Sequence, residues 1–544
     1  MRTKTFMIVL VATVLASSCS QPSKKEDPEM RKKVEQFALV DLKADLSQLT
    51  PRQREMLKKL VEASEIMEDL FWKDAFPGDR DAFLKSLPDE ATREYARIMY
   101  GPWDRMDGNK PFVAGYGEKP AGANYYPTDI TKEEFEAWDN PNKMDWYSLV
   151  RRDENGKLIQ IPYHEAYKEE VTKAAQLLRE AAQLADDEGF KKYLELRAQA
   201  FETDDYLASD LAWMDMRTNI FDIVIGPIES YEDQFMGARA AHSAQILIKD
   251  LEWSARLDKY GELLPKLQAA LPCDPKFKQE KAHADANMYV YDVILYRGDC
   301  NAGSKNIAIN LPNDPRVHEQ KGSRKLQLKN SMQAKFEKIL LPIAEQVIDK
   351  EQLKHIKFDA FFENVMFHEV AHGLGIKQTI NGNGTVRDAL KETYSSIEEN
   401  KADILGLFMV YQLYQMGEFP QKDLMDNYVT FMAGLFRSIR FGASSAHGIA
   451  NLMRYNYFNE KGAFVRDEAT GTYRVDFEKM TQAMFDLGRE ILTIQGNGDY
   501  ETAKRWIQEK GVMSDILKAD LDRINSSGIP VDIRFNQGAS VLGL

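Results

Sequence analysis

The sequence is poor in cysteine and histidine and has no excess of basic residues. Its 544 residues include 3 cysteines and 8 histidines, and the net charge is -14. Beyond the N-terminal region only Cys273 and Cys300 remain; they could form one bridge or stay as free thiols, but they exclude a disulfide-based scaffold. We find no basic patch that could neutralise phosphates, which argues against nucleic acid as the main partner.

The most apolar part of the chain is at the N-terminus, but even there no run is long enough to span a membrane. The run from Phe6 to Ala16 is too short to span a bilayer permanently. It follows Arg2 and Lys4 and leads to Cys19, which is the layout of a secretory signal. We therefore expect residues 1–19 to be a signal peptide.

Cys19 has a second significance, because it follows three small residues. This resembles a bacterial lipoprotein cleavage site, with Leu15 one place further from the cysteine than is usual. We expect Cys19 to carry a lipid that holds the exported chain on a bacterial envelope membrane, at its periplasmic face or at the cell surface. Secretion with cleavage nearby is the alternative. The polar residues 20–35 are expected to form a flexible tether.

The body of the chain has the composition of a water-soluble globular protein, 44% hydrophobic and 29% charged. No internal repeat or long low-complexity segment appears, and a chain of this length predicts two or more lobes rather than one core. Apolar residues at three- and four-residue steps predict helices at 27–42, 169–201, 325–348 and 395–414. Shorter strand-like pieces lie at 157–163, 288–296, 306–312 and 528–535. The fold class is α+β with helix in excess.

The stretch FHEVAHGLG, residues 367–375, places two of the eight histidines four residues apart. On a helix His368 and His372 share one face, so two imidazoles can bind one ion while Glu369 lies beside it. Imidazole is a good zinc ligand, and the adjacent carboxylate can take a proton from metal-bound water. The pattern indicates a catalytic zinc site; the alternative is an ordinary helix with two histidines.

A catalytic zinc also needs a third protein ligand and an open position for water. A histidine six residues after His372 would supply it, but that position is Gln378. The helix predicted at 395–414 offers Glu399 and Asp403, four residues apart. One can bind the metal while the other accepts a hydrogen bond from a ligating imidazole. Taken alone, these acids are also typical of a solvated helix start.

HEVAH followed by EENKAD resembles the two zinc motifs of the dipeptidyl peptidase III family of metallopeptidases. That family's first motif usually has one more residue between its histidines, so the resemblance is to a variant branch. Three further segments, spread with the motifs over roughly 220 residues in the family's order, resemble it too. They are GPIESYEDQFMGARA at 226–240, INLPNDPRVHEQKGSRKLQLKN at 309–330 and SSAHGIAN at 444–451.

The resemblance implies one zinc ion per chain. Its ligands would be His368, His372 and Glu399. Glu369 would be the general base that activates a zinc-bound water, and Asp403 would hold a ligating imidazole. Two histidines and a carboxylate suit zinc best, although cobalt or manganese would be accepted.

The resemblance also assigns residues to the substrate. Asn310, Asn313 and Asp222 would help to hold the free N-terminus of a peptide, and His447 would steady the substrate or the developing oxyanion. Alternatively, the two asparagines that flank Pro312 are turn residues and His447 is structural.

Two positions depart from the family's pattern. Val224 stands where the family has a tyrosine that acts in the transition state, and Asn451 where it has an arginine for the carboxylate side of the substrate. The implied function is zinc-dependent release of dipeptides from the free N-termini of short peptides. These departures leave two alternatives open: a zinc peptidase of other specificity, and a surface lipoprotein that binds peptides without cleaving them.

The fold that the resemblance implies is two lobes about a wide cleft, one mainly helical and zinc-binding, the other containing a β-barrel. We expect the helical lobe to comprise residues 246–304 and 331–515. The other lobe would comprise 36–245, with returning segments at about 305–330 and 516–544.

Overall fold

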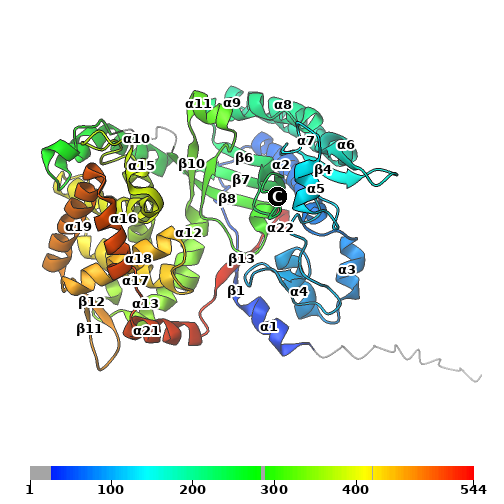
Figure 1. The fold of residues 1–544 in the computed structure, drawn as a ribbon. Helices are drawn as coiled ribbons and strands as arrows, with labels where there is room; N and C mark the ends of the chain where they lie inside the picture. The colour runs from blue at the N-terminus through cyan, green and yellow to red at the C-terminus, as the bar shows by residue number, and fades with distance from the viewer. Residues whose placement is uncertain (1–25, 283–287, 420) are drawn as a thin grey trace, which may run out of the picture.

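The computed structural model describes residues 26–282, 288–419 and 421–544. The chain forms two lobes that lie side by side (Figure 1). Each has its own hydrophobic core: the sheet lobe packs around buried residues from Leu42 to Leu328, and the helical lobe around buried residues from Trp253 to Ile533. The predicted two-lobed, helix-rich α+β architecture is confirmed.

The sheet lobe contains one five-stranded sheet in the order β6-β7-β8-β10-β9. Its strands are β6 (Phe221–Glu229), β7 (Ala241–Lys249), β8 (Met288–Gly298), β9 (Ala308–Leu311) and β10 (Arg324–Leu328). The β8–β10 pair is parallel and the other pairs are antiparallel. Within the described residues no ladder joins β6 to β9.

Helices from the first part of the chain cover this sheet (Figure 1). The long helix α2 (Pro51–Ala75) begins with a capping box made by Thr50 and Gln53 and packs on β7 and β8. The run predicted at 169–201 is two helices, α7 (Lys168–Leu184) and α8 (Glu188–Thr203), because the Asp187 side chain caps a new helix at Phe190 N.

The remaining elements of this part of the chain are α1 (Pro28–Glu35), β1 (Phe37–Asp41), α3 (Arg80–Ser86), α4 (Glu90–Met99), β2 (Trp103–Asp104), β3 (Lys110–Pro111), α5 (Lys132–Ala137), β4 (Ser148–Arg152), β5 (Leu158–Pro162), α6 (Tyr163–Ala166), α9 (Leu207–Asp215), η2 (Asp299–Asn301) and α11 (Pro315–Lys321).

The helical lobe is built around the packed pair α14 and α16. Helix α16 buries residues around its whole circumference, including Leu405 and Phe408, as expected for a helix at the centre of a lobe. The elements of this lobe are α10 (Leu251–Ala270), η1 (Pro275–Phe277), α12 (Lys329–Lys335), the π-helical η3 (Phe336–Leu340), α13 (Leu341–Val347), η4 (Leu353–His355), α14 (Phe358–Ala371), α15 (Val386–Leu390), η5 (Lys391–Thr393), α16 (Tyr394–Gln415), α17 (Leu424–Ile439), α18 (Ala446–Glu460), β11 (Phe464–Arg466), β12 (Tyr473–Val475), α19 (Phe477–Asn497), α20 (Tyr500–Lys510) and α21 (Asp515–Ser526).

The division of the chain between lobes differs from the expected one in two places. Residues 246–304 were expected in the helical lobe, but of their described elements only α10 and η1 lie there, because β8 is the central strand of the sheet. Residues 516–544 were expected to return to the sheet lobe. Instead α21 packs in the helical core through Leu517 and Ile524, and β13 (Asp532–Asn536) then pairs with β1. A short helix, α22 (Ala539–Leu542), ends the chain.

The expected tether at 20–35 is wrong from residue 28 on, because Pro28–Glu35 is helix α1, capped by Asp27. The helix predicted over 27–42 stops there. Phe37–Asp41 forms β1 instead, since the distant strand β13 pairs with it in parallel. The signal peptide and Cys19 lie outside the described residues.

Cys273 and Cys300 are both free thiols. Cys273 packs against the helical core and Cys300 against the core of the sheet lobe, so the fold keeps them apart. No helix in the described part of the chain is long and apolar enough to cross a bilayer.

Candidate metal centre

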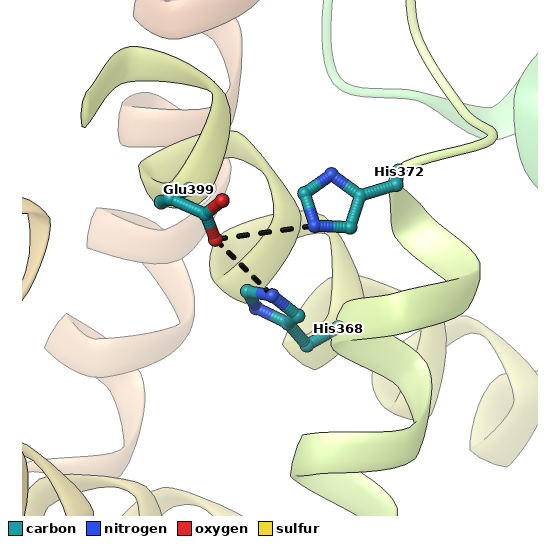
Figure 2. Close-up of side chains that lie close together, drawn as sticks. All are labelled: His368, His372 and Glu399. Carbon is teal, nitrogen blue, oxygen red and sulfur yellow. Dashed lines mark ion pairs between the residues drawn. The ribbon is translucent and has the colours of Figure 1, made fainter. Parts of the chain in front are cut away.

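Helix α14 delivers the two histidines of the HEVAH motif. His368 lies in its last turn and His372 directly follows its last residue, so both imidazoles leave the same face (Figure 2). The opposite face is held in the core by buried side chains such as Phe362 and Phe367. The helix therefore fixes both histidines relative to the lobe.

Helix α16 crosses α14 closely enough to bring Glu399 to the two histidines. The crossing depends on Gly406, where a Cβ atom would lie 2.8 Å from His368 N. Because glycine has no side chain, the two backbones can touch at this point. Gly406 was not predicted, since the role of a glycine within a helix can be recognised only when the element that packs against it is known.

Three ligand atoms of His368, His372 and Glu399 lie within 4.8 Å of one another (Figure 2). Glu399 Oε2 is 3.3 Å from His368 Nε2 and 3.9 Å from His372 Nε2. Zinc bonds of about 2.1 Å in a tetrahedron place neighbouring ligand atoms about 3.4 Å apart. The arrangement therefore has the size of a zinc site, on the three ligands that were predicted.

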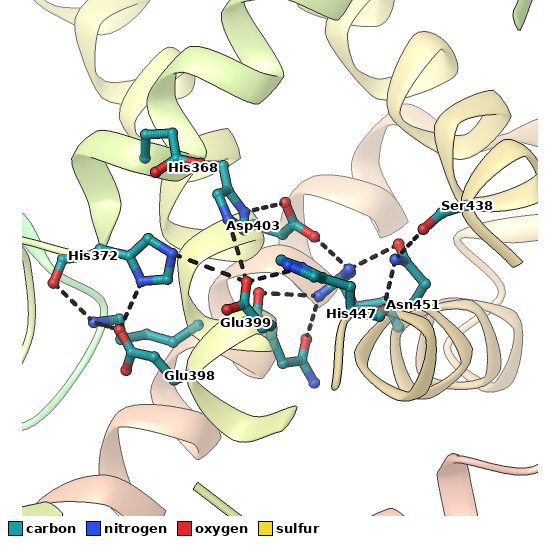
Figure 3. Close-up of polar contacts among 12 residues, drawn as sticks. His368, His372, Glu398, Glu399, Asp403, Ser438, His447 and Asn451 are labelled. Carbon is teal, nitrogen blue, oxygen red and sulfur yellow. Dashed lines mark hydrogen bonds and ion pairs between the residues drawn. The ribbon is translucent and has the colours of Figure 1, made fainter. Parts of the chain in front are cut away.

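The other nitrogen of each imidazole is held by a carboxylate (Figure 3). His368 Nδ1 lies 2.6 Å from Asp403 Oδ1, and His372 Nδ1 lies 2.9 Å from Glu398 Oε1. A carboxylate only accepts, so each Nδ1 carries a proton and each Nε2 is the atom left to bind a metal. Asp403 has the predicted role. Glu398 was not predicted, although it stands next to Glu399 in the motif.

Residues behind the two carboxylates anchor them. Asp403 pairs with the buried guanidinium of Arg454, whose position α18 supplies. Glu398 lies 2.8 Å from Lys401 Nζ and accepts a hydrogen bond from Gln495. Neither imidazole can turn without breaking such a network, so the site is rigid before any ion binds.

The electrostatics of the site favour a cation. Burial opposes charge on His368, but Asp403 and Glu399 outweigh it and raise the pKa of the imidazole to about 10. Burial likewise opposes the Asp403 carboxylate, yet Arg454 and His368 hold its pKa at about 2. Glu399 Oε2 is buried and faces imidazole nitrogens of His368, His372 and His447. A divalent cation fits this donor set.

Glu369 lines a cleft of about 770 Å³ between the lobes. Its Oε2 lies 3.3 Å from Lys325 Nζ on β10, so the sheet lobe reaches across to the helical lobe here. The cleft is lined by side chains of both lobes, among them Asn310, Lys325, His368, Glu369, His372, Glu399 and His447. Lys325 was not predicted.

His447 lies at the start of α18, after the cap Ser445. Its side chain is 64% exposed and its Nδ1 is 3.0 Å from Glu399 Oε2. A hydrogen bond to Glu399 raises the pKa of this imidazole against the opposing effect of burial. His447 is thus part of the site and not a buried structural histidine.

The three residues predicted to bind the N-terminus of the substrate lie in different environments, and the two asparagines are described first. Asn310 is exposed and lines the cleft beside Lys325, its partner in the β9–β10 register. Asn313 donates to Glu229 Oε2 at 2.9 Å and to the Ile228 carbonyl, outside the cleft lining.

The prediction for Asp222 is corrected by its burial. Its carboxylate is 0% exposed and accepts hydrogen bonds from Trp213 Nε1 and Tyr291 OH inside the sheet lobe. The physical reason is that β6 is buried on both of its faces from Phe221 to Pro227, so neither Asp222 nor Val224 reaches the cleft.

Asn451, the other departure from the family's pattern, lies near His447 (Figure 3). Its amide nitrogen donates to Ser438 Oγ and to the His447 carbonyl, each at 2.7 Å, and its oxygen accepts from Arg454. It therefore braces the helices behind the site.

Comparisons with known proteins agree with this geometry. The sequence model of Peptidase family M49 matches residues 141–404, which include both motifs. Nudix hydrolase 3 of Arabidopsis thaliana is 34% identical over 586 residues, covering 96% of this chain and 75% of that protein.

Two solved structures are similar over nearly their whole length. The structure of DPP III from Caldithrix abyssi is 40% identical with a TM-score of 0.88, covering 94% of this chain and 99% of that one. Dipeptidyl-peptidase III from Corallococcus sp. strain EGB is 36% identical with a TM-score of 0.73, covering 94% and 97%. The chain therefore belongs to peptidase family M49 and is a metallopeptidase of the dipeptidyl peptidase III type.

Proposed function

We propose that this peptidase releases dipeptides from the free N-termini of short peptides, with one zinc ion held by His368, His372 and Glu399. The observation that carries the proposal is the buried Glu399 oxygen, which faces two Nε2 atoms whose Nδ1 partners are carboxylates. When bound, zinc supplies a Lewis acid and acidifies a water to a pKa of about 7.

The residues around the position of the ion would carry out the other steps of the reaction. Glu369 is free of the ligand set and faces the cleft, so its carboxylate can take the proton of the attacking water and return it to the leaving amine. His447 is largely exposed and can turn from Glu399 toward the developing oxyanion. Asn310 stands across the cleft, where its amide can bind the peptide near its N-terminus.

The burial of Asp222 favours one alternative, a zinc peptidase of other specificity. Without that carboxylate in the cleft, recognition of a free amino terminus depends on other groups, such as Asn310. A dipeptidyl peptidase and a zinc peptidase of other specificity would use the same hydrolytic residues here, so only the position of the bond that is cut distinguishes the two functions.

The test uses protein that starts at residue 20, incubated with matched short peptides that carry either a free or an acetylated N-terminus. Products are identified by mass spectrometry. We expect dipeptides from the free peptides only. The Glu369→Gln variant should keep its zinc, measured by elemental analysis, and lose about 100- to 10,000-fold in kcat.

The other outcomes are equally informative. Internal or C-terminal cuts would retain the hydrolytic mechanism and reject dipeptide release. If zinc-loaded protein cleaves nothing but binds the peptides, the chain is a peptide-binding protein. Equal activity of Glu369→Gln and the unmutated protein would reject Glu369 as the base.

A further inference from the structure

A second cavity opens beside the catalytic base and is not explained by metal binding. It has a volume of about 240 Å³ and lies between α14, α17 and α18. It reaches His368, Glu369 and His447 but not His372. A group bound there would therefore lie next to the reacting atoms on one side of the cleft.

The walls of this cavity are mainly apolar and belong to two helix faces. Phe361 and Val365 of α14 face Phe431 and Leu435 of α17 across it. Between them stands Gly434, where a Cβ atom would find nothing within 4 Å. Glycine costs stability inside a helix, so an open space at this position indicates that α17 leaves the cavity unfilled.

One cation lies in this apolar wall. Arg437 is the only lysine or arginine among the described residues that line the cavity, and it follows Thr430 and Gly434 at helical spacing. Its guanidinium lies 5.7 Å from the ring centroid of Phe361 and forms no hydrogen bond or ion pair within the described part of the chain. Burial lowers the pKa of Arg437, and Asp532 opposes this.

The polar groups around Arg437 already have other partners. Asp532 forms an ion pair with Lys335 at 2.9 Å. Asn451, also in the cavity wall, uses its amide on Ser438 and on the His447 carbonyl. The two carboxylates that line the cavity, Asp403 and Glu369, are paired with Arg454 and Lys325. A half-buried cation without an ion pair is costly, so the site is prepared for an anion that comes from outside the chain.

We propose that this cavity binds a carboxylate of the peptide substrate and that Arg437 determines specificity for it. The carboxylate is either the C-terminus of a short peptide or an acidic side chain close to the bond that is cut. Arginine suits this role because its planar fork donates two parallel hydrogen bonds to a carboxylate. The inference rests on the proposed peptidase function, because it places a peptide beside Glu369.

The test compares peptide pairs that differ in one carboxylate. One pair has the same sequence with a C-terminal acid or amide; a second pair is amidated and carries Glu or Gln directly after the bond that is cut. The variants are Arg437→Gln, Arg437→Lys and Gly434→Leu, with Arg489→Gln as control because Arg489 is an exposed arginine of α19. Circular dichroism and zinc content confirm that each variant is folded.

We expect the unmutated protein to prefer the carboxylate member of one pair by about 10- to 100-fold in kcat/KM, mainly through KM. Arg437→Gln should abolish that preference, because it should lower kcat/KM on the carboxylate peptide far more than on the amide or Gln peptide. Arg437→Lys should keep part of it. Gly434→Leu should also abolish it, since the leucine would fill the cavity without changing charge. Arg489→Gln should change nothing.

Which pair shows the preference identifies the source of the carboxylate. The proposal is overturned if neither pair shows a preference, or if Arg437→Gln weakens both members of a pair alike. Binding of the same pairs to zinc-loaded Glu369→Gln protein, measured by calorimetry, repeats the test without turnover. A protein that cleaves nothing but shows the Arg437-dependent difference in affinity would reject the proposed catalysis and retain this site.

Discussion

At the scale of single residues, the candidate metal centre depends on carboxylates that do not touch the ion. Asp403 orients His368 and is itself held by Arg454. Asp403→Asn should weaken zinc binding by about 10- to 100-fold, because the amide no longer accepts in the same way from Nδ1 and from Arg454. Competition with a chelator measures this affinity. Asp522→Asn, an exposed carboxylate of α21, is the matched control, and equal affinities of both variants would contradict the role of Asp403.

A second residue-scale effect concerns stability in the sheet lobe. Burial and the neighbouring Glu232 raise the pKa of Asp299 to about 7, well above its usual 3.8. The folded state therefore holds this proton more tightly than the unfolded chain. The stability it contributes is complete below about pH 4 and is lost as the pH rises through 7.

Asp299→Asn mimics the protonated form and tests this dependence. We expect the variant and the unmutated protein to unfold alike near pH 4. At pH 8 the variant should be more stable, by up to about 4 kcal/mol. Thermal unfolding across this pH range measures the difference. If the difference in stability between the two proteins is the same at every pH, the proton on Asp299 does not cause it.

At the scale of elements, the site exists because α14 and α16 touch at Gly406. Gly406→Ala places a Cβ atom 2.8 Å from His368 N, so the helices must separate. We expect a loss of about 1 to 3 kcal/mol in the free energy of unfolding, with weaker zinc binding, because His368 moves away from Glu399.

Gly434→Ala is the matched control, since it also replaces a helical glycine but meets nothing within 4 Å. It should stabilise the protein by up to about 1 kcal/mol through helix propensity alone. Denaturant unfolding of both variants decides the comparison. If both variants change the free energy of unfolding in the same direction, the crossing of α14 and α16 can accommodate a methyl group.

At the scale of the whole molecule, the cleft combines two lobes with different tasks. The helical lobe holds the proposed metal ligands and Glu369, and the sheet lobe contributes Asn310 from the edge strand β9 and Lys325 from its neighbour β10. The contact between Lys325 and Glu369 links the lobes across the cleft. A peptide between them would touch both.

We propose that the whole molecule is exported and held at a membrane by a lipid on Cys19. Cells expressing the full chain and fed a labelled fatty acid should incorporate label into the membrane-bound protein. Cys19→Ser should abolish labelling and release the protein from the membrane. Labelling that survives the substitution would reject Cys19 as the anchor.

Much of the site could be predicted because it depends on local geometry. Helix periodicity places His368, His372, Glu399 and Asp403 on usable faces whatever surrounds them. Predicted strands at 157–163, 288–296, 306–312 and 528–535 correspond to β5, β8, β9 and β13 for the same reason. Strands β6 and β7 were not predicted. Both are buried almost throughout, so buried and exposed residues do not alternate along them.

The sequence by itself determined the fold class and pointed to the proposed metal ligands and base, since the positions of these residues follow from spacing along single helices. Only the tertiary structure decided that Asp222 is buried, that Asn310 lines the cleft, that Glu398 holds His372 and that Gly406 permits the helix crossing. It also decided that Arg437 stands in a cavity beside Glu369. The physical reason is that a strand or helix has a fixed period but no fixed partner. Which of its faces meets the core, the cleft or another helix depends on segments far away in the chain.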